Sequence, residues 1–238
     1  MVHHLTLGGI AVDVVMKDIK NLHLSVYPPT GRVTIAAPTR MSIDAIRLFA
    51  ISRLGWIRQQ RLKLQTQERE TRREYLERES HYVWGARYLL HVVERDQAPT
   101  VELKHRRLVL TVRPATDGTR REAIVARWYR DQVRSVAADL VAKWEPILEV
   151  PVRLVYVQQM KTRWGSCNAR ARAIRLNTEL AKKPRACLEY IVVHEMVHLL
   201  EPTHGARFAR LIDEALPTWR FGRQELNHLP VQHVDWEY

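Results

Sequence analysis

The chain has 238 residues, 46% of them apolar and 27% charged, a composition that is typical of a folded globular protein and excludes wholesale disorder. Lysine and arginine total 38 against 26 acidic residues, which gives a formal net charge of +12. No segment approaches the roughly 18 uncharged apolar residues of a membrane span, so we expect a soluble protein without membrane contact. Two cysteines, Cys167 and Cys187, are too few for a disulfide scaffold and favour the reducing cytoplasm.

The first part of the chain predicts strands followed by a helix. Residues 22–27 (LHLSVY) alternate apolar and polar side chains, a Pro-Pro-Thr-Gly turn follows, and residues 33–37 (VTIAA) resume the strand pattern. Ser42 is predicted to cap a helix that continues into residues 61–80. That stretch is polar almost all round, as in a solvated helix or a linker. We therefore predict an N-terminal β-hairpin and helix subdomain over residues 1–78.

The middle of the chain alternates between strand and helix patterns, and no internal repeat is apparent. Strands are predicted at residues 82–94, 101–112, 152–157 and 174–177. Between the second and third of them, apolar side chains from Ile124 to Trp144 recur at helical spacing and predict a long amphipathic helix. RWGSC at residues 163–167 is predicted to be a turn, and Pro184 is predicted to begin the next helix.

That next helix contains the run VHEMVHLLEPTH, residues 193–204, in which three histidines and one glutamate interrupt an apolar segment. The surrounding residues predict burial, and a buried polar group without a partner costs about 1–3 kcal/mol. A second amphipathic helix, which begins near Phe208, is predicted to support the first. A bound metal ion is the simplest way to satisfy all of these polar side chains together.

The spacing of the histidines fits one metal ion. His194 and His198 are four residues apart, so both rings project from one face of a helix. Pro202 is predicted to end the helix and to let the chain bring His204 back as a third ligand. Three protein nitrogens with one open position are typical of a catalytic site for a single Zn²⁺ ion, with Glu195 beside the metal without binding it.

This arrangement predicts an enzyme, a metal-dependent hydrolase that cleaves peptide bonds through a metal-activated water. Glu195 is the expected general base, which takes the proton of the water and passes it to the leaving amine. The group that stabilises the oxyanion stays open among Arg163, Tyr190 and the histidines His228 and His233. The carboxylates that could accept the second N–H of a histidine ligand are Asp213 and Glu214.

The segment from residue 161 to residue 185 is strongly basic. Its basic residues are Lys161, Arg163, Arg170, Arg172, Arg175, Lys182, Lys183 and Arg185. The only acidic residue there is Glu179. This bias suggests an acidic substrate, a phosphate or a nucleic acid nearby. It supports an alternative function, a metal-dependent hydrolase of nucleotides or other phosphorylated small molecules.

Several motifs together resemble the YgjP-like metallopeptidases, a family related in fold to the SprT/Spartan proteases. They are KTRWGSC at residues 161–167, IRLN at 174–177, YIVVHEMVHL at 190–199, and then His204 and Phe208. A further stretch, IKNLHLSV at residues 19–26, is similar to the start of the family.

The resemblance implies an α+β chain with a minimal zincin-like catalytic domain, which we place at residues 79–222, followed by a C-terminal tail at residues 223–238. It implies that His194, His198 and His204 hold the zinc, that Glu195 is catalytic, and that the substrates are peptides or proteins. Together with the positive charge, the relation to SprT/Spartan proteases supports a third function. In this alternative the chain is a nucleic-acid-associated protein that acts on DNA-bound proteins.

Overall fold

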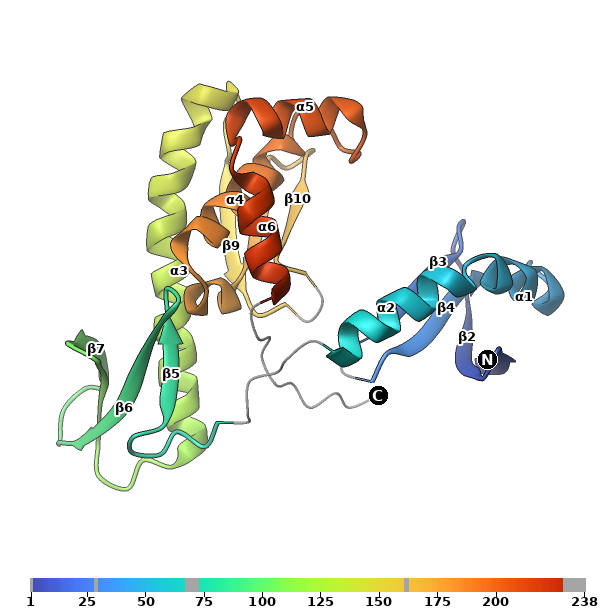
Figure 1. Cartoon of the computed structure of the whole chain (residues 1–238). Helices are drawn as coiled ribbons and strands as arrows, with labels where there is room; N and C mark the ends of the chain where they lie inside the picture. Colours follow the sequence, from blue (N-terminus) through green and yellow to red (C-terminus); the bar gives the residue numbers. More distant parts are fainter. Residues whose placement is uncertain (1, 28–29, 67–72, 161–162, 229–238) are drawn as a thin grey trace. The chain divides into compact units, whose positions relative to one another are not determined.

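The computed structural model describes residues 2–27, 30–66, 73–160 and 163–228 (Figure 1). These residues form two compact units, one made by the described residues up to 66 and the other by those from 73 onward. Each unit is built around its own hydrophobic core. Both contain helices and mixed β-sheets, so the predicted α+β class is confirmed. Within the described part of the chain, no helix is both long and apolar enough to span a membrane.

The first unit is a four-stranded sheet that packs on two helices through one of its faces. Its elements are β1 (Val2–Leu7), β2 (Ile10–Lys17), β3 (His23–Tyr27), β4 (Arg32–Pro38), α1 (Ile43–Ser52) and α2 (Leu54–Thr66). The strands lie in the order β1-β2-β4-β3, with β2 and β4 parallel and the outer pairs antiparallel. Alternate side chains such as Val14 and Ile35 are fully buried in the same cluster as Ile46 of α1, as expected for a sheet with one face on a core.

The hairpin and the helix start predicted for this unit are confirmed. β3 and β4 are antiparallel neighbours, and residues 28–29 of their turn lie outside the described residues. Ser42 caps α1, because its Oγ accepts a hydrogen bond from the backbone N–H of Ala45 at 3.3 Å. The prediction of one continuous helix is wrong, since α1 ends at Ser52 with Arg53 as its C-cap residue, and α2 begins at Leu54.

The second unit carries the remaining elements. They are β5 (Ser80–Val83), β6 (Ala86–Glu94), β7 (Thr100–Lys104), β8 (Arg107–Val112), α3 (Gly118–Leu148), β9 (Leu154–Gln158), β10 (Gly165–Asn168), β11 (Ala173–Asn177), the 3₁₀ helix η1 (Thr178–Lys182), α4 (Arg185–Val197), α5 (Ala206–Ala215) and α6 (Trp219–His228). The long helix predicted around residues 124–144 is confirmed as α3, and the strand predicted at 174–177 is confirmed as β11.

Two of the predicted strands are hairpins instead. The stretch 82–94 is divided by a turn at Trp84 and Gly85, whose φ angles are 49° and 81°. The stretch 101–112 is divided by a turn at His105, whose φ is 53°. Both turns place residues in the left-handed region that two-residue hairpin loops require. The strand-like composition on both sides of each turn therefore concealed a change of direction.

A structural repeat is present that the sequence does not reveal. The sheet formed by β5 to β8 has the order β5-β6-β8-β7, with the central pair parallel and the outer pairs antiparallel. This is the same topology as the sheet formed by β1 to β4 in the first unit. The first hairpin of each sheet turns through two residues of positive φ, at Gly8–Gly9 and at Trp84–Gly85. Each sheet is followed by a helix that a side chain caps, Ser42 for α1 and Asp117 for α3.

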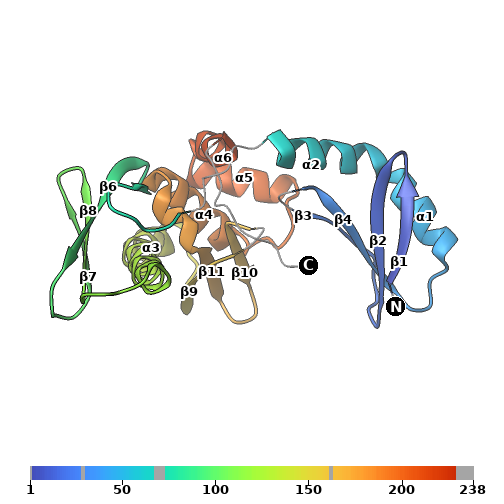
Figure 2. The same ribbon diagram turned by 90° about the horizontal axis from the view of Figure 1, so that it is seen from below.

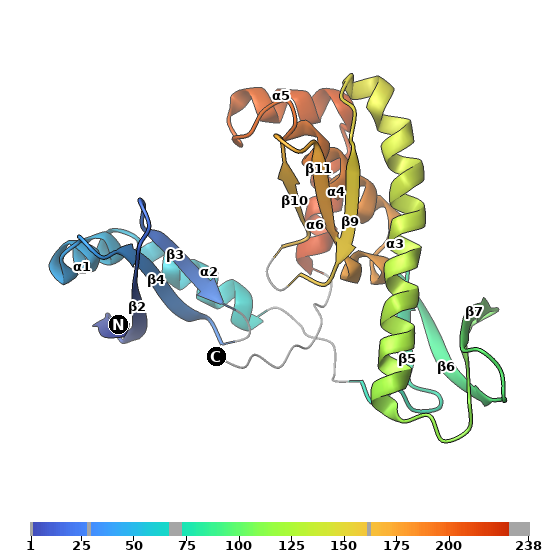
Figure 3. The same ribbon diagram turned by 180° about the vertical axis from the view of Figure 1, so that it is seen from behind.

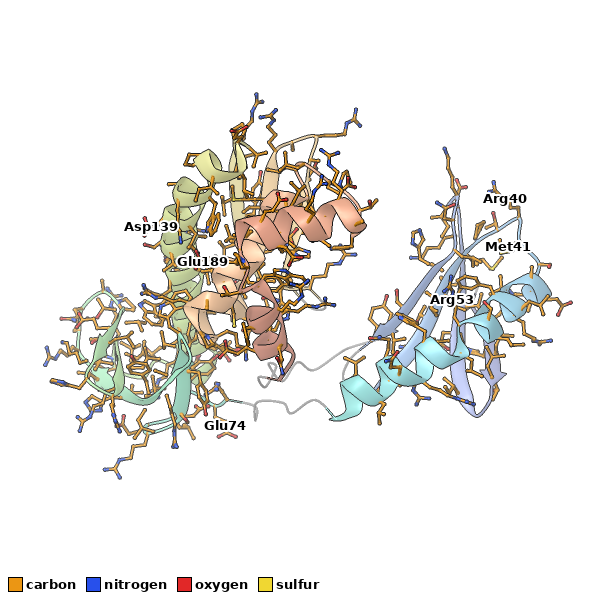
Figure 4. The ribbon with its side chains drawn as sticks, turned by 45° about the horizontal axis from the view of Figure 1, so that its top comes forward. Arg40, Met41, Arg53, Glu74, Asp139 and Glu189 are labelled. Carbon is orange, nitrogen blue, oxygen red and sulfur yellow. The ribbon has the colours of Figure 1, made fainter. Side chains whose placement is uncertain are left out.

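Helix α4 lies at the centre of the second unit. The sheet β10-β11-β9 packs on one side of it, and α3, α5 and α6 pack around the rest (Figures 2 and 3). Glu189 of α4 accepts hydrogen bonds from Lys143 Nζ at 2.7 Å and from Trp144 Nε1 at 3.0 Å, which joins α4 to α3 (Figure 4). Elements on every side explain why the sequence of α4 is apolar almost throughout.

Candidate metal centre

The motif helix α4 begins where its sequence indicates but ends earlier than predicted. Pro184 is its N-cap residue, as predicted, because proline lacks the N–H that a helix start leaves unpaired. The helix ends at Val197 rather than continuing to Pro202, and His198 is its C-cap residue. The φ and ψ of His198 are still helical, −65° and −16°, so its ring stays on the face of the helix that carries His194.

The three histidines of the motif converge on one point. Nε2 of His204 lies 3.1 Å from Nε2 of His194 and 3.1 Å from Nε2 of His198. These three rings are the group of side chains that could hold a metal ion among the described residues. His204 belongs to the segment between α4 and α5, which returns toward α4 after the helix ends. The third ring therefore comes from outside the helix, as the spacing predicted.

The donor geometry fits a zinc ion. Two nitrogens bound 2.0–2.1 Å from one zinc at a tetrahedral angle are about 3.3 Å apart, close to the separations found here. Nδ1 of His198 lies 3.0 Å from the carbonyl oxygen of Glu201, and because a carbonyl only accepts, this nitrogen carries the proton. Nε2 of His198 is left to face Nε2 of His204, an arrangement that a cation at the centre would stabilise.

His194 and His204 have lowered pKa values, which favour the neutral form that metal binding needs. Burial, with smaller contributions from the neighbouring rings of His198 and His204, lowers the pKa of His194 to about 4. Burial is also the largest cause of the lowered pKa of His204. An unprotonated ring offers its lone pair to a metal without first losing a proton, so the site is prepared for a cation.

Glu195 lies beside the histidines and is 5% exposed. Burial raises the pKa of its carboxyl group to about 7, against a smaller lowering by the guanidinium of Arg163. A carboxylate with such a pKa can take up a proton and release it again near neutral pH. The same carboxylate and burial together raise the pKa of the Cys167 thiol to about 11, so this cysteine stays protonated.

RWGSC is not the turn that the sequence predicted, because residues from Gly165 to Asn168 form strand β10, antiparallel to β11. The glycine is needed for space rather than for a bend. A Cβ atom at Gly165 would lie 2.6 Å from Oε1 of Glu195 and 2.9 Å from Cγ2 of Ile191. The backbone of β10 thus lies directly on the carboxylate of Glu195, and any larger residue would displace it.

A cleft of about 400 Å³ opens at the histidines. Its lining residues are Arg163, Gly165, Ser166, Cys167, Ala169, His194, Glu195, His198, Pro202 and His204. Arg163 is exposed, and it is the one basic lysine or arginine side chain among these described lining residues. β10 forms one wall, and it is an edge strand because β11 is its single neighbour in the described sheet.

Asn177 holds the loop that leads to β10, a role that sequence reasoning missed. Its Nδ2 donates to the carbonyl oxygens of Met160 at 2.9 Å and Arg163 at 2.8 Å, and its Oδ1 accepts from the backbone N–H of Glu179 at 3.1 Å. Its own backbone N–H donates to the carbonyl oxygen of Trp164 at 2.9 Å. The sequence did contain a signal for this role, because Asn177 is a polar residue at the end of the strand IRLN. A buried asparagine usually forms hydrogen bonds with several backbone groups.

Of the other oxyanion candidates, the structure describes the side chain of Tyr190. Tyr190 is 6% exposed, and its ring lies 5.7 Å from the ring of His194 and stacks on Trp219 at 6.0 Å, so it is behind His194. His228 ends α6, but its side chain lies outside what the structure describes, as does the whole of His233.

The candidate carboxylates bind elsewhere too. Asp213 accepts hydrogen bonds from Trp219 Nε1 and Arg220, and Glu214 forms an ion pair with Arg210 at 3.9 Å. Within the described part of the chain, neither carboxylate forms a hydrogen bond or an ion pair with a histidine of the site. The backbone carbonyl of Glu201 orients His198 instead.

The basic residues between 161 and 185 do not form one surface. Lys182 and Lys183 are buried, at 7% and 3% exposure, and Lys182 pairs with Glu179 at 2.8 Å. Arg163 faces the cleft, and Lys161 lies outside the described residues. Exposed basic side chains remain at Arg170, Arg172, Arg175 and Arg185. The basic residues of this segment therefore lie in several separate environments.

Comparison with known proteins adds a family to this geometry. No curated protein matches the chain at a significant level. The metallopeptidase zymogen abylysin of Pyrococcus abyssi is similar over 41% of this chain and 99% of its own, with 20% identity and a TM-score of 0.37. The zymogen jannalysin of Methanocaldococcus jannaschii is similar over 38% and 96%, with 20% identity and a TM-score of 0.32. The profile of the YgjP-like metallopeptidase domain matches residues 20–229, and the chain therefore belongs to the YgjP-like metallopeptidase family.

Proposed function

We propose that this metallopeptidase hydrolyses peptide bonds with one zinc ion held by His194, His198 and His204. The observation that carries the proposal is the convergence of three Nε2 atoms, each within 3.1 Å of a neighbour, beside a buried carboxylate in a cleft. Three nitrogen ligands leave a fourth position open, which distinguishes a catalytic zinc site from a structural one.

When bound, zinc would polarise the scissile carbonyl and make a water molecule easier to deprotonate. Glu195 would accept the proton of the attacking water at its carboxylate and then donate it to the amine that leaves. The backbone of β10 at Gly165 excludes water from one side of this carboxylate and fixes its position. Pre-set positioning of the base removes an entropic part of the reaction barrier.

Arg163 is the group that we propose for stabilising the oxyanion or a substrate carboxylate. Its side chain lines the cleft and is close enough to Glu195 to lower the pKa of that residue. A guanidinium can donate two parallel hydrogen bonds to oxygen atoms that carry negative charge. Tyr190 stays a weaker candidate for this role, because it lies behind His194 and is absent from the described cleft lining.

The edge strand supports a peptide substrate. β10 is the outer strand of its sheet among the described residues, and it lines the cleft that contains the histidines. An extended peptide can add to such an edge through main-chain hydrogen bonds, which bring its carbonyl groups past the site in a fixed register. The two alternative functions need basic side chains that bind phosphate groups. Among the described residues that line the cleft, Arg163 is the single lysine or arginine.

The test is zinc analysis combined with a casein or peptide-cleavage assay of the wild type and of Glu195→Gln. We expect one zinc per chain in both proteins, and cleavage in the wild type alone. His204→Ala serves as the second variant, which should lose both zinc and cleavage. Equal cleavage by the wild type and Glu195→Gln would rule out the proposed mechanism. Phosphate release from nucleoside triphosphates above the Glu195→Gln background would favour the nucleotide alternative.

We also propose that the enzyme acts in the cytoplasm. This is supported by Cys167 and Cys187, which are both free thiols, because a reducing compartment preserves free thiols. Nucleic-acid association remains a prediction from the net charge and from the resemblance to SprT/Spartan proteases. It is checked by measuring DNA affinity as a function of salt, where no binding at low salt would remove it.

A further inference from the structure

The ring of Phe208 touches all three histidines of the metal centre. Its centroid lies 5.0 Å from that of His194, 4.7 Å from that of His198 and 4.8 Å from that of His204. Phe208 is 5% exposed and lies in the first turn of α5, directly after the segment that carries His204. All three separations are within the range of favourable aromatic pairs. One apolar ring thus packs against all three imidazoles.

Among the three histidines, His198 alone has a hydrogen bond from its Nδ1 atom to another described residue. A histidine that binds a metal usually donates its second N–H to a carboxylate, a carbonyl or a water molecule, which fixes the orientation of the ring. Here Nδ1 of His198 has such a partner in the carbonyl of Glu201. Nδ1 of His194 is buried and has no hydrogen-bond partner in the described part of the chain. The contacts recorded for His204 are ring contacts and the two Nε2 separations.

We infer that Phe208 is a positioning residue for the metal centre, because its ring sets the orientation of His194 and His204, whose Nδ1 atoms form no hydrogen bond within the described residues. The inference rests on the proposed zinc site. His194 is fixed to α4 by its backbone, whereas His204 lies beyond the end of that helix. Phe208 connects the two, because it belongs to α5 and packs its ring against the ligands of both segments.

The packing geometry gives each ring a defined contact. His194 and His204 meet Phe208 at interplanar angles of 66° and 69°, close to edge-on, whereas His198 is tilted at 37°. Edge-to-face contacts depend on angle as well as on distance, so they restrict rotation of the imidazole. An aliphatic side chain would fill part of the space but would not restrict the angle in the same way. Phe208→Leu should therefore loosen the two unsupported rings.

The experiment measures metal binding by the full chain, without any substrate. Zinc affinity is obtained by competition with a chromophoric chelator, and the ligand geometry is followed by the visible absorption of the Co²⁺-substituted protein. Phe208→Leu should weaken zinc binding by about tenfold to hundredfold and change the Co²⁺ spectrum. Phe208→Tyr keeps the ring and should stay within about threefold of the wild type.

The matched control is Ile212→Val, one turn further along α5, at a side chain that is fully buried. It should lower the melting temperature while leaving zinc affinity and the Co²⁺ spectrum unchanged. If Phe208→Leu keeps wild-type affinity and spectrum, or if Phe208→Tyr loses as much affinity as Phe208→Leu, the inference is overturned. Failure of the wild type to bind stoichiometric zinc would instead refute the proposed function, so the two outcomes are distinguishable.

Discussion

Replacing Gly165 with alanine should separate catalysis from metal binding. The added Cβ would lie 2.6 Å from Oε1 of Glu195 and 2.9 Å from Cγ2 of Ile191, whereas ordinary contact begins at 3.4 Å. The carboxylate must therefore move by about 0.8 Å, or β10 must move away from α4 by a similar amount. Neither adjustment involves the imidazoles, because the nearest atoms to the added methyl group belong to Glu195 and Ile191.

The expected loss of activity follows from this displacement. A misplacement of about 1 Å in a catalytic group costs about a hundredfold in rate, which corresponds to about 2.7 kcal/mol of transition-state stabilisation. Crowding of a packed site costs a further 1–3 kcal/mol or so in folding free energy. We therefore expect Gly165→Ala to lower kcat/KM by about thirtyfold to a hundredfold, to lower the melting temperature modestly, and to retain its zinc.

The assay compares peptide cleavage, zinc content and thermal unfolding for the wild type, Gly165→Ala and Gly205→Ala. Gly205 is a suitable control because it follows the ligand His204, yet a Cβ there would meet only Thr203 Oγ1, at 4.0 Å. Gly205→Ala should therefore stay close to the wild type. Activity of Gly165→Ala within threefold or so of the wild type would refute the close-approach argument. Parallel loss of zinc would show that the substitution acts on the ligands and not on the base.

Three further predictions concern stability. Because burial raises the pKa of Glu195 to about 7 from 4.5, ionisation of this carboxyl disfavours the folded metal-free protein as pH rises between these values. The lowered pKa of His194 acts in the opposite direction over much of the same range, so the loss due to Glu195 is measured as the difference between the wild type and Glu195→Gln. Glu195→Gln should remove this loss, which is on the order of 3 kcal/mol at most, as measured by denaturant unfolding across pH. Asn177→Ala should lower the free energy of unfolding by about 1–3 kcal/mol for each buried backbone group left unpaired, as followed by calorimetry, and Asn177→Asp should fall between it and the wild type. Lys182→Met should cost about 3–5 kcal/mol, because it leaves buried Glu179 without its partner, and adding Glu179→Leu should recover most of that loss in a double-mutant cycle.

The local features of the metal centre could be predicted from the sequence. Two histidines four residues apart share a helix face whatever surrounds the helix, and a proline start with an apolar run defines α4. The return of His204 follows from the end of that helix. These predictions depend on short-range geometry, so they survived the error in where α4 ends.

The contacts that hold the centre in place could not be predicted. Gly165 is far from Glu195 in sequence, and its small size has a purpose only once β10 lies against α4. Phe208 has the ordinary apolar spacing of a core residue, and that spacing does not indicate that its ring meets three imidazoles. Such roles arise from packing between distant segments, for which a single sequence carries no periodic signal.

The hairpins were missed for a different reason. Trp84 occupies a left-handed position with φ of 49°, where glycine, asparagine or aspartate is the usual residue. A bulky aromatic residue gives no turn signal, so the segment from 82 to 94 has the pattern of one long strand. The corresponding turn of the sheet formed by β1 to β4 is Gly8–Gly9. Because tryptophan replaces the first of these glycines in the second sheet, the sequence does not show that the two sheets have the same topology.

The Trp84–Gly85 turn bears on how far the protease could be shortened. The backbone N–H groups of Trp84 and Gly85 donate to the carbonyl oxygens of Ala181 and Lys182 at 2.7 Å and 3.2 Å, immediately before the proline that starts the motif helix. A fragment that began at α3 would retain every residue assigned to chemistry, yet it would expose these carbonyls and leave the entrance to α4 unsupported. The sheet formed by β5 to β8 is thus an integral part of the protease scaffold, and removing it would destabilise the start of the motif helix.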